Sequence, residues 1–278
     1  MISLKPYNTY HIDSRAKYVY FPNTIDEIIQ IYQQHLKVIV LGNGSNVILS
    51  QSNYFDIAFI ILQNNFNGIK TTSDGIYAKA GNLLKELSIY AYEHNLGGME
   101  TFFDIPASVG GAMIMNTGAY GDEIYDHLVY VDVLDISTTQ IKRYYKPDIH
   151  YGYRFSMFRS LNVVILGACF KLLTKDSSAI KAKMDDILKQ RQAKLPIEPS
   201  AGSVFKRPPY HITVGEMVEK IGLKGYQIGG AQISNKHGGV IINVGEATGM
   251  DILKLINAIK YAVSTHYNIK LELEQVVI

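Results

Sequence analysis

Apolar residues recur along this chain with two periods, which predict a mixture of helices and strands. In residues 24–35 one helical face carries Ile25, Ile28, Ile29 and Tyr32, and Thr24 has capping-box spacing to Glu27. Similar patterns predict helices at 82–96, where two glycines follow, and at 177–194, 213–221 and 249–267. Short runs rich in Val, Ile and Leu predict strands at 37–41, 47–50, 57–62, 76–80, 129–134, 140–144, 163–172, 240–243 and 270–278.

The order of these elements bears on the fold class and on the domains. Helices and strands are mixed without strict alternation, which favours an α+β fold over a doubly wound parallel sheet. The charged helix at 177–194, which Pro196 ends, is expected to lead from a first domain, residues 1–175, into a smaller second domain, residues 176–278. The last strand of the second domain is free to pack back on the first.

Composition and charge mainly exclude classes of protein. The 278 residues are 47% apolar and 19% charged, as in a globular chain, and a net charge of +2 argues against nucleic acid or a membrane as partner. Cys169 is the single cysteine, so no internal disulfide forms, and no His, Cys or carboxylate pair has a metal-ligand spacing. The first residues lack a signal peptide's apolar core, and no apolar run is long enough to span a membrane. We therefore expect a cytoplasmic protein without a metal site.

A first candidate for ligand binding is the turn at 42–46, in "VIVLGNGSNVIL". It follows a strand with Gly-x-Gly, but the third glycine and the following helix of the dinucleotide-binding fingerprint are lacking. Gly42 and Gly44 still allow positive φ and close approach, so that N–H groups can point at an anion, and Ser45 and Asn46 add side-chain donors. An ordinary tight turn between two strands is the alternative.

A second candidate is the weakly charged segment at 105–123, "IPASVGGAMIMNTGAYGDE". Gly110 and Gly111 allow a backbone turn without a Cβ in the way, and the amides of residues 116–119 are expected to be exposed. The residues between are apolar. Apolar contacts beside unshielded N–H groups suit a flat, partly apolar ligand with a phosphate tail, such as a flavin dinucleotide. The alternative is a buried loop with close backbone packing.

Four motifs in this order resemble the UDP-N-acetylenolpyruvoylglucosamine reductases (MurB) of bacterial cell-wall synthesis. They are "LGNGSNVILS", "METFFDIPASVGGAMIMNTGAYGDEI", "YGYRFSMFR" and "PSAGSVFKRPP", and the likeness runs over nearly the whole chain. The stretch "GAQISNKHGGVIINVGEAT" is similar to the shorter class of the family. The resemblance implies a PCMH-type (vanillyl-alcohol-oxidase-like) FAD-binding domain, followed by a smaller α+β substrate-binding domain.

The resemblance also implies a reaction and its participants. NADPH would reduce bound FAD, and a hydride from flavin N5 would then reduce the enolpyruvyl group of a UDP-linked amino sugar to give UDP-N-acetylmuramate, a precursor of peptidoglycan. The two substrates would use one pocket in turn. No feature of the residues distinguishes NADPH from NADH, and no obligate protein partner is expected.

The family motifs imply two sets of binding residues. Tyr153, Lys206 and Arg207 are the implied contacts of the nucleotide sugar. The implied contacts of FAD are Gly42, Asn43, Gly44, Ser45, Asn46, Ser108, Val109, Gly110, Gly111, Asn116, Gly118 and Ala119.

Reduction of an enol ether that bears a carboxylate needs fixed positive charge near the carboxylate and a proton for the adjacent carbon. The family motifs assign the charge to Arg154, whose guanidinium can fork onto a carboxylate, and the proton to Ser203 rather than to the nearby Ser200. Glu274 falls where the family has a catalytic glutamate on its last strand. Glu272 lies two residues back, and the residues alone do not separate the two glutamates.

Several positions depart from the family pattern. A carboxylate at Asp104 is expected to repel a pyrophosphate unless it points to solvent. The departures concern affinity more than reaction type, because all three implied catalytic residues are retained. The departing residues are Asn43, Asp104 and Ala107 in place of glycines, Arg207 in place of an asparagine, Leu273 in place of a proline and Val276 in place of an arginine.

Two other functions stay open. A flavin oxidase on the same fold would pass electrons to O₂, but such enzymes often tether the flavin through His or Cys. Cys169 lies in a predicted strand, and no histidine lies in the glycine-rich segments. A catalytically impaired relative would bind FAD or a nucleotide sugar without turnover, and the departures from the family pattern motivate that alternative.

Overall fold

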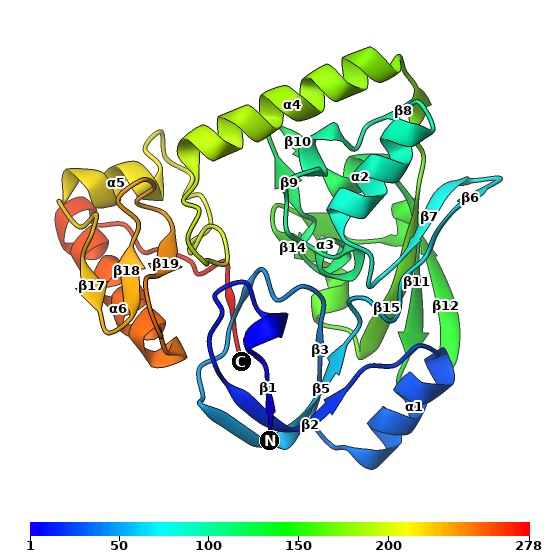
Figure 1. Ribbon diagram of the computed structural model, residues 1–278, viewed down its shortest axis with the longest axis horizontal. Helices are drawn as coiled ribbons and strands as arrows, with labels where there is room; N and C mark the ends of the chain where they lie inside the picture. Colours follow the sequence, from blue (N-terminus) through cyan, green and yellow to red (C-terminus); the bar gives the residue numbers. More distant parts are fainter. The chain divides into compact units, whose positions relative to one another are not determined.

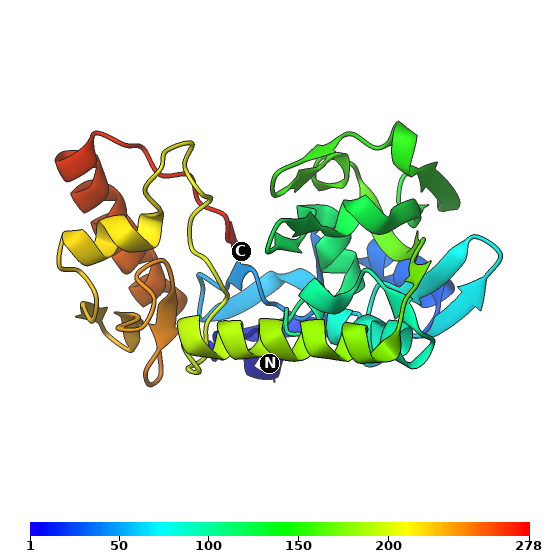
Figure 2. The same cartoon turned by 90° about the horizontal axis from the view of Figure 1, so that it is seen from above.

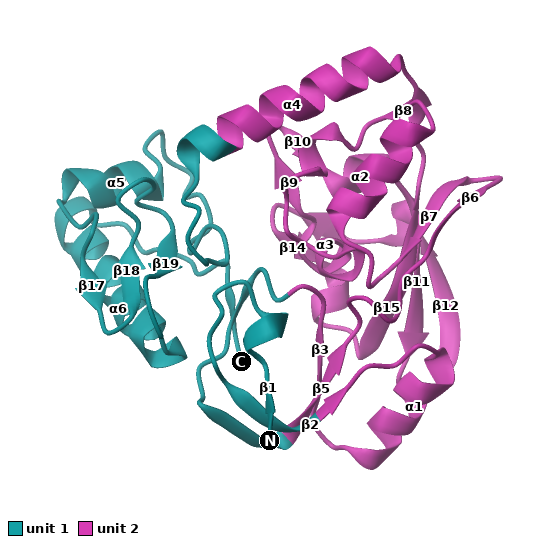
Figure 3. Ribbon diagram, viewed as in Figure 1, with its two compact units in different colours: residues 1–18, 44–56, 192–278 teal, residues 19–43, 57–191 magenta.

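The computed structural model describes residues 1–278, and the chain forms two compact units. Unit 1 consists of Met1–Tyr18, Gly44–Asp56 and Gln192–Ile278, and unit 2 consists of Val19–Asn43 and Ile57–Arg191 (Figure 3). Each unit therefore joins segments that are far apart in the sequence. Helices and sheets occur in both units, which confirms the α+β fold class.

The core of unit 2 is a five-stranded antiparallel sheet with the strand order β12-β11-β15-β7-β6 (Figure 1). The central strand β15 is buried along almost its whole length, because its apolar run is covered on both faces. The helix α3 (Val109–Met115) packs against β15 and β7. The strands are β6 (Ile69–Thr72), β7 (Gly75–Lys79), β11 (Leu128–Asp135), β12 (Gln140–Tyr145) and β15 (Val163–Phe170).

Shorter elements complete unit 2. The helix α1 (Ile25–Gln34) begins at Thr24, whose side chain accepts a hydrogen bond from the Glu27 amide at 3.2 Å, as the capping-box spacing predicts. β3 (Val38–Leu41) runs parallel to β5 (Asn53–Ile61), whose first residues belong to unit 1. The other elements are α2 (Leu84–Glu93), β8 (Leu96–Gly97), β9 (Gly118–Ala119), β10 (Asp122–Glu123), β13 (Tyr151–Gly152), β14 (Phe155–Ser156) and β16 (Leu173–Thr174).

In unit 1 a three-stranded antiparallel sheet, β17-β18-β19, packs against α6 (Gly249–Tyr267), which in turn contacts α5 (Val214–Lys220). Thr248 caps α6 through a hydrogen bond from the Asp251 amide, and Asn268 ends it in the left-handed conformation. The strands of unit 1 are β1 (Ile2–Ser3), β2 (Arg15–Tyr20, which continues into unit 2), β4 (Val47–Ile48), β17 (Gln227–Ile228), β18 (Ala231–Ile233), β19 (Ile241–Asn243) and β20 (Val276–Val277).

The long helices agree with the sequence pattern, whereas the last strand does not. Helices α6 and α4 (Ser177–Lys194) have the predicted bounds, and α4 passes from unit 2 into unit 1 (Figure 2, yellow-green). Of the strand predicted at 270–278 only β20 forms, in parallel pairing with β4. Residues 272 and 274 instead make single backbone hydrogen bonds to the segment 204–206, so no regular ladder develops there. The domain boundary at residue 175 stays a prediction.

The sequence pattern also missed α3. Its two glycines lower helix propensity, which concealed the helix within a segment that reads as a loop. Ser108 supplies the missing signal, because its hydroxyl caps the helix by accepting a hydrogen bond from the Gly111 amide at 3.2 Å. No helix of the structure is both long and apolar enough to cross a membrane.

Candidate active site

The first glycine turn brings together two of the predicted FAD-binding segments within unit 2. A Cβ added to Gly42 would lie 1.9 Å from Ser108 Oγ, so a side chain at this position would clash with the residue that caps α3. Asn43, which stands in place of a family glycine, donates a hydrogen bond from Nδ2 to the Pro106 carbonyl at 2.8 Å. The turn after β3 and the segment before α3 are thus in direct contact.

The rest of this turn, residues 44–46, belongs to unit 1 and is held by both ends of the chain. Gly44 has φ +59°, and a Cβ there would lie 2.2 Å from the Tyr7 carbonyl oxygen. Asn46 donates from Nδ2 to the Glu274 carbonyl at 3.3 Å and accepts from the Val276 amide at 2.9 Å. A predicted FAD-binding residue and a predicted catalytic residue therefore lie side by side.

The amides at the start of α3 are hydrogen-bonded within the chain. The Val109 amide donates to the Asn82 carbonyl at 2.8 Å, and the Gly110 amide donates to the Ala80 carbonyl at 2.9 Å. A Cβ on Gly110 would lie 3.1 Å from the Ala80 Cβ. The glycines therefore allow α3 to pack closely on the chain after β7, as the alternative of close backbone packing requires. The assignment of these residues to FAD stays a prediction.

One cluster of predicted site residues in unit 2 consists of Asn116, Gly118, Tyr153 and Arg154. Asn116 ends α3 with φ +44°, is fully buried, and donates from Nδ2 to the Gly152 carbonyl at 3.1 Å. Arg154 lies in the two-residue turn between β13 and β14, and its Nη2 donates to the Gly118 carbonyl at 2.8 Å. Its guanidinium carbon lies 5.0 Å from the centre of the Tyr153 ring.

The backbone of Arg154 is strained. Its φ of +54° is in the left-handed region, which costs a residue with a Cβ about 1 kcal/mol. Conformations of this kind persist where the surrounding structure imposes them, and they concentrate at functional sites. Eight other residues with a Cβ also have positive φ, so this strain by itself does not mark Arg154 as functional.

Ser203 and Glu274 lie on neighbouring extended segments of unit 1. The Glu274 amide donates to the Val204 carbonyl at 2.9 Å, and Phe205 pairs with Leu273 in an isolated bridge. Ser203 is exposed, whereas Val204 beside it is buried. The segment therefore presents the serine hydroxyl outward while its neighbour anchors the chain.

Gln275 is a residue of this site that the sequence pattern missed. It is buried, and its Nε2 donates to the carbonyls of Ala201 at 2.9 Å and Gly202 at 3.3 Å. Its Oε1 accepts a hydrogen bond from the hydroxyl of Tyr10 at 3.0 Å. Burial raises the pKa of Tyr10 by more than this hydrogen bond lowers it, so the phenol stays protonated and donates. Gln275 thus holds the chain that leads into Ser203.

The structure distinguishes the two glutamates that the sequence left open. The Glu272 side chain is 70% exposed and accepts a hydrogen bond from the Lys206 ammonium. Glu272 also accepts from the Lys206 amide at 2.9 Å through its backbone carbonyl. Glu274 is partly buried and makes its backbone contacts with Val204 and Asn46. Arg207, next to Lys206, is exposed.

Asp104, the departure expected to repel a pyrophosphate, has a cationic partner. Nε of Arg191 lies 2.9 Å from its carboxylate Oδ2, and Nη2 of Arg191 donates to its backbone carbonyl at 3.2 Å. No pattern in the sequence connects two residues that are so far apart along the chain. The ion pair neutralises the charge that the sequence left uncompensated.

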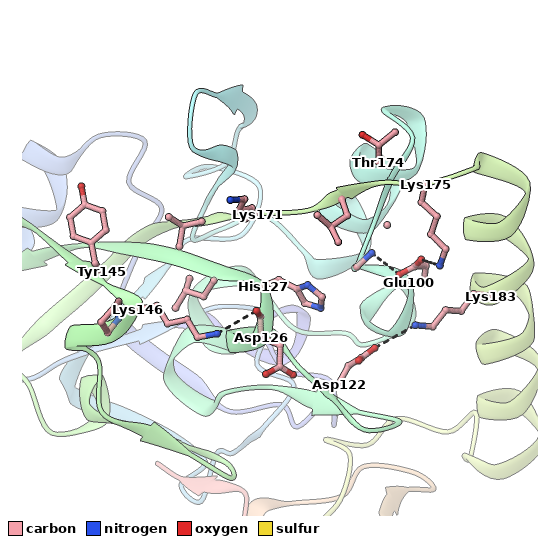
Figure 4. Close-up of a pocket in the computed structure, with 16 residues that line it drawn as sticks. Glu100, Asp122, Asp126, His127, Tyr145, Lys146, Lys171, Thr174, Lys175 and Lys183 are labelled. Carbon is pink, nitrogen blue, oxygen red and sulfur yellow. Dashed lines mark hydrogen bonds and ion pairs between the residues drawn. The ribbon is translucent and has the colours of Figure 1, made fainter.

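A separate pocket of about 1010 Å³ in unit 2 contains none of the predicted site residues (Figure 4). Its charged groups largely satisfy one another. Glu100 pairs with Lys175 at 2.8 Å, and Asp122 pairs with Lys183 at 3.5 Å (Figure 4). Burial lowers the pKa of His127 in its wall. The volume of this pocket is therefore no evidence for the position of the active site.

The residues present fit a flavin dinucleotide. A Cβ on Gly152, two residues before Arg154, would meet no atom within 4 Å, and the same holds for Gly202, next to Ser203. Each unit thus keeps open space beside a predicted catalytic residue. Ser45 and Asn46 supply polar side chains, and Arg154 supplies a permanent positive charge.

Comparison with known proteins gives consistent matches. The family described as "FAD binding domain" matches residues 16–143, and the family described as "UDP-N-acetylenolpyruvoylglucosamine reductase, C-terminal domain" matches residues 192–278. A Francisella tularensis protein named UDP-N-acetylenolpyruvoylglucosamine reductase is 53% identical over 278 residues, covering 100% of this chain and 99% of the relative. A protein of the same name from Thermotoga maritima is 40% identical over 268 residues, covering 95% of this chain and 92% of the relative.

A solved structure agrees with these matches. The crystal structure of UDP-N-acetylenolpyruvylglucosamine reductase (MurB) from Thermus caldophilus has a TM-score of 0.85 to this chain at 29% sequence identity. The match covers 99% of this chain and 97% of the other. The Francisella tularensis relative is matched over 99% of its own length at 53% identity. This chain belongs to the family of UDP-N-acetylenolpyruvoylglucosamine reductases.

Proposed function

We propose that this chain reduces UDP-N-acetyl-3-O-(1-carboxyvinyl)glucosamine to UDP-N-acetylmuramate, with FAD as cofactor and NADPH as reductant, in the cytoplasmic synthesis of peptidoglycan precursors. The observation that carries the proposal is the full-length, 53% identical relative that bears the name of this reductase. Arg154, Ser203 and Glu274 support it, since all three are retained at positions that match the family motifs.

The reaction places a hydride on the terminal carbon of the enolpyruvyl group and a proton on the adjacent carbon. FAD, when bound and reduced, supplies the hydride. The guanidinium of Arg154 binds the substrate carboxylate, where negative charge accumulates during the reaction. Its contact with the Gly118 carbonyl and the tight β13–β14 turn orient the side chain before the substrate arrives. Less reorganisation is then needed when the charge develops.

Ser203 Oγ donates the proton to the carbon. An exposed hydroxyl is a weak acid, so the segment that carries Ser203 must be held in position and in a positive field. Gln275 fixes the chain before Ser203, and the Val204 amide donates to the Gly239 carbonyl at 3.1 Å. Lys206, three residues on, supplies an ammonium group that the Glu272 carboxylate partly offsets, and Glu274 on the adjacent segment assists the proton transfer.

The other predicted residues bind and orient the nucleotide sugar and FAD. Tyr153, Lys206 and Arg207 contact the nucleotide sugar. FAD is held by the contacting segments around Gly42 and Ser108, by residues 44–46, and by the chain from Asn116 to Ala119 at the end of α3.

The test is an anaerobic spectral titration of the purified protein. We expect a yellow protein whose colour NADPH removes, and whose colour the enolpyruvyl nucleotide sugar restores without oxygen. Colour restored by air alone would favour a flavin oxidase. A protein that carries no FAD and takes up none on reconstitution would contradict the proposal, as would one that binds FAD but is not reoxidised by the substrate.

A further inference from the structure

Asp104 lies in the turn that leads into α3, close in sequence to the groups that contact the Gly42 turn. Two residues on, the Pro106 carbonyl accepts the hydrogen bond from Asn43 at 2.8 Å. Four residues on, Ser108 is nearly fully buried and faces Gly42. A charge at position 104 therefore belongs to the same short segment that is proposed to border the flavin pyrophosphate.

Arg191 contacts this turn in two ways. Its side chain is only 16% exposed, although the Asp104 side chain that it pairs with is 39% exposed. One contact, from Nε to the carboxylate, balances the charge, and the other, from Nη2 to the backbone carbonyl, restrains the path of the chain. A guanidinium can make both contacts at once because its donors are fixed in one plane, whereas an ammonium is a single point charge.

We propose that Arg191 is a positioning residue for the flavin cofactor, a role that rests on the proposed function. It cancels the negative charge of Asp104 within the turn that borders the dinucleotide site and fixes that turn against α4. Without Arg191, an uncompensated carboxylate would act on the two negative charges of the pyrophosphate, and binding of FAD would weaken. The effect is electrostatic, so salt reduces it.

The proposal is tested by the dissociation constant of FAD, measured from the fluorescence of FAD released when the holoenzyme is diluted. Arg191→Gln keeps a polar side chain, although a shorter one, and removes its charge. We expect this variant to raise the dissociation constant about fivefold at low ionic strength, which is about 1 kcal/mol for a partly exposed ion pair. At about 1 M salt the difference from the wild-type protein shrinks, because the charges are screened.

Two further variants separate charge from simple tethering. Arg191→Lys keeps the charge and loses the second contact, and we expect a smaller rise of the dissociation constant than for Arg191→Gln. The double variant Arg191→Gln with Asp104→Asn removes both charges, and we expect it to return to within about twofold of the wild-type value. Thermal unfolding of each variant checks that the fold persists. A variant that does not fold is replaced by the Asp104→Asn single variant, for which we expect FAD binding at least as tight as in the wild type.

Three results would overturn the inference. They are an unchanged dissociation constant in Arg191→Gln, an equal loss in the single and double variants, and a loss of affinity in Asp104→Asn alone. These results are distinct from failure of the proposed function. A wild-type protein that binds no FAD contradicts the proposed function, whereas a wild-type protein that binds FAD as tightly as Arg191→Gln contradicts this inference alone.

Discussion

The glycine-rich part of unit 2 and the C-terminal segments of unit 1 carry candidate site residues in opposite surroundings. Around α3 the candidates are packed, and Ser108 and Asn116 are nearly or fully buried with their polar groups hydrogen-bonded. In unit 1 Ser203 is exposed on an extended segment held by single backbone contacts and by Gln275. The first region is built for close packing, and the second presents side chains.

This contrast separates the two kinds of defect that substitutions should produce. A change in the packed region forces neighbouring backbone to move, so it should reduce stability and FAD content together. A change at an exposed reactive group leaves packing intact, so it should reduce the rate of one step and little else.

The largest expected effect is that of Ser203→Ala. We expect reoxidation of the flavin by the nucleotide sugar to slow by about 10²-fold or more, because a positioned proton donor contributes at least that much. Reduction by NADPH should keep its rate, and the melting temperature should not change. Stopped-flow absorbance measures the two half-reactions separately, with Ser200→Ala as the matched control. Equal loss in both half-reactions would show that Ser203 is not the proton donor.

Gly42→Ala should have the next largest effect, now on stability. The new Cβ would lie 1.9 Å from Ser108 Oγ and 3.0 Å from Ser108 Cβ, so the cap of α3 must move. We expect a loss of about 2 kcal/mol in the free energy of unfolding, measured by denaturant titration, together with a lower FAD content. Gly152→Ala in the same unit is the control for the free energy of unfolding, because its Cβ meets no atom within 4 Å. Similar losses in both variants would contradict the contrast between packed and open glycines.

A pH effect of intermediate size should arise in unit 1 from His237. Burial lowers the pKa of His237, and this effect exceeds that of a backbone hydrogen bond that raises the pKa. The Nδ1 atom of His237 accepts a hydrogen bond from the Gly239 amide at 3.1 Å. The unfolded chain therefore binds this proton more readily than the folded one, so the folded state is penalised once the pH falls below the unfolded pKa of about 6.5. Above that pH the penalty is absent.

The penalty should be about 1 kcal/mol, the net contribution of one hydrogen bond that protonation of Nδ1 removes. Denaturant titrations of the wild type and of His237→Gln between pH 7.5 and about 5 measure it. We expect the wild type to lose more stability over this range than the variant does. Parallel pH profiles for the two proteins would exclude His237 as the source of the effect.

The smallest effect should be that of Glu272→Gln. Its ion pair with Lys206 has a strongly exposed carboxylate, and such pairs contribute less than about 0.5 kcal/mol. We expect the free energy of unfolding and the turnover number to stay close to those of the wild type. Glu274→Gln is the variant to compare with it, since this change should slow reoxidation of the flavin by the nucleotide sugar. Reversal of the two results would exchange the assigned roles of the glutamates.

Periodic patterns in the sequence predicted the long elements well, because each depends on residues a few positions apart. The helices α4 and α6 have the predicted bounds, and Thr24 caps α1 as predicted, although the Glu27 carboxylate accepts from the Asn23 amide and not from that of Thr24. The ordered motifs also predicted the family, the α+β fold and the cofactor correctly. Short elements were less predictable, because α3 contains Gly110 and Gly111 and depends on a single capping hydroxyl.

No local pattern in the sequence predicted which distant segments contact one another in the folded chain. The amides of Val109 and Gly110 donate hydrogen bonds to carbonyls of residues 80–82, because that segment passes close to the start of α3. The partner of Asp104 lies in α4, and the support of Ser203 comes from Gln275, a residue without a distinctive sequence signal. Composition and spacing therefore specify which chemical groups and local elements the chain has, since these are properties of neighbouring residues. Which charges are cancelled and which amides are satisfied depends on contacts between distant segments, and these exist only once the chain has folded.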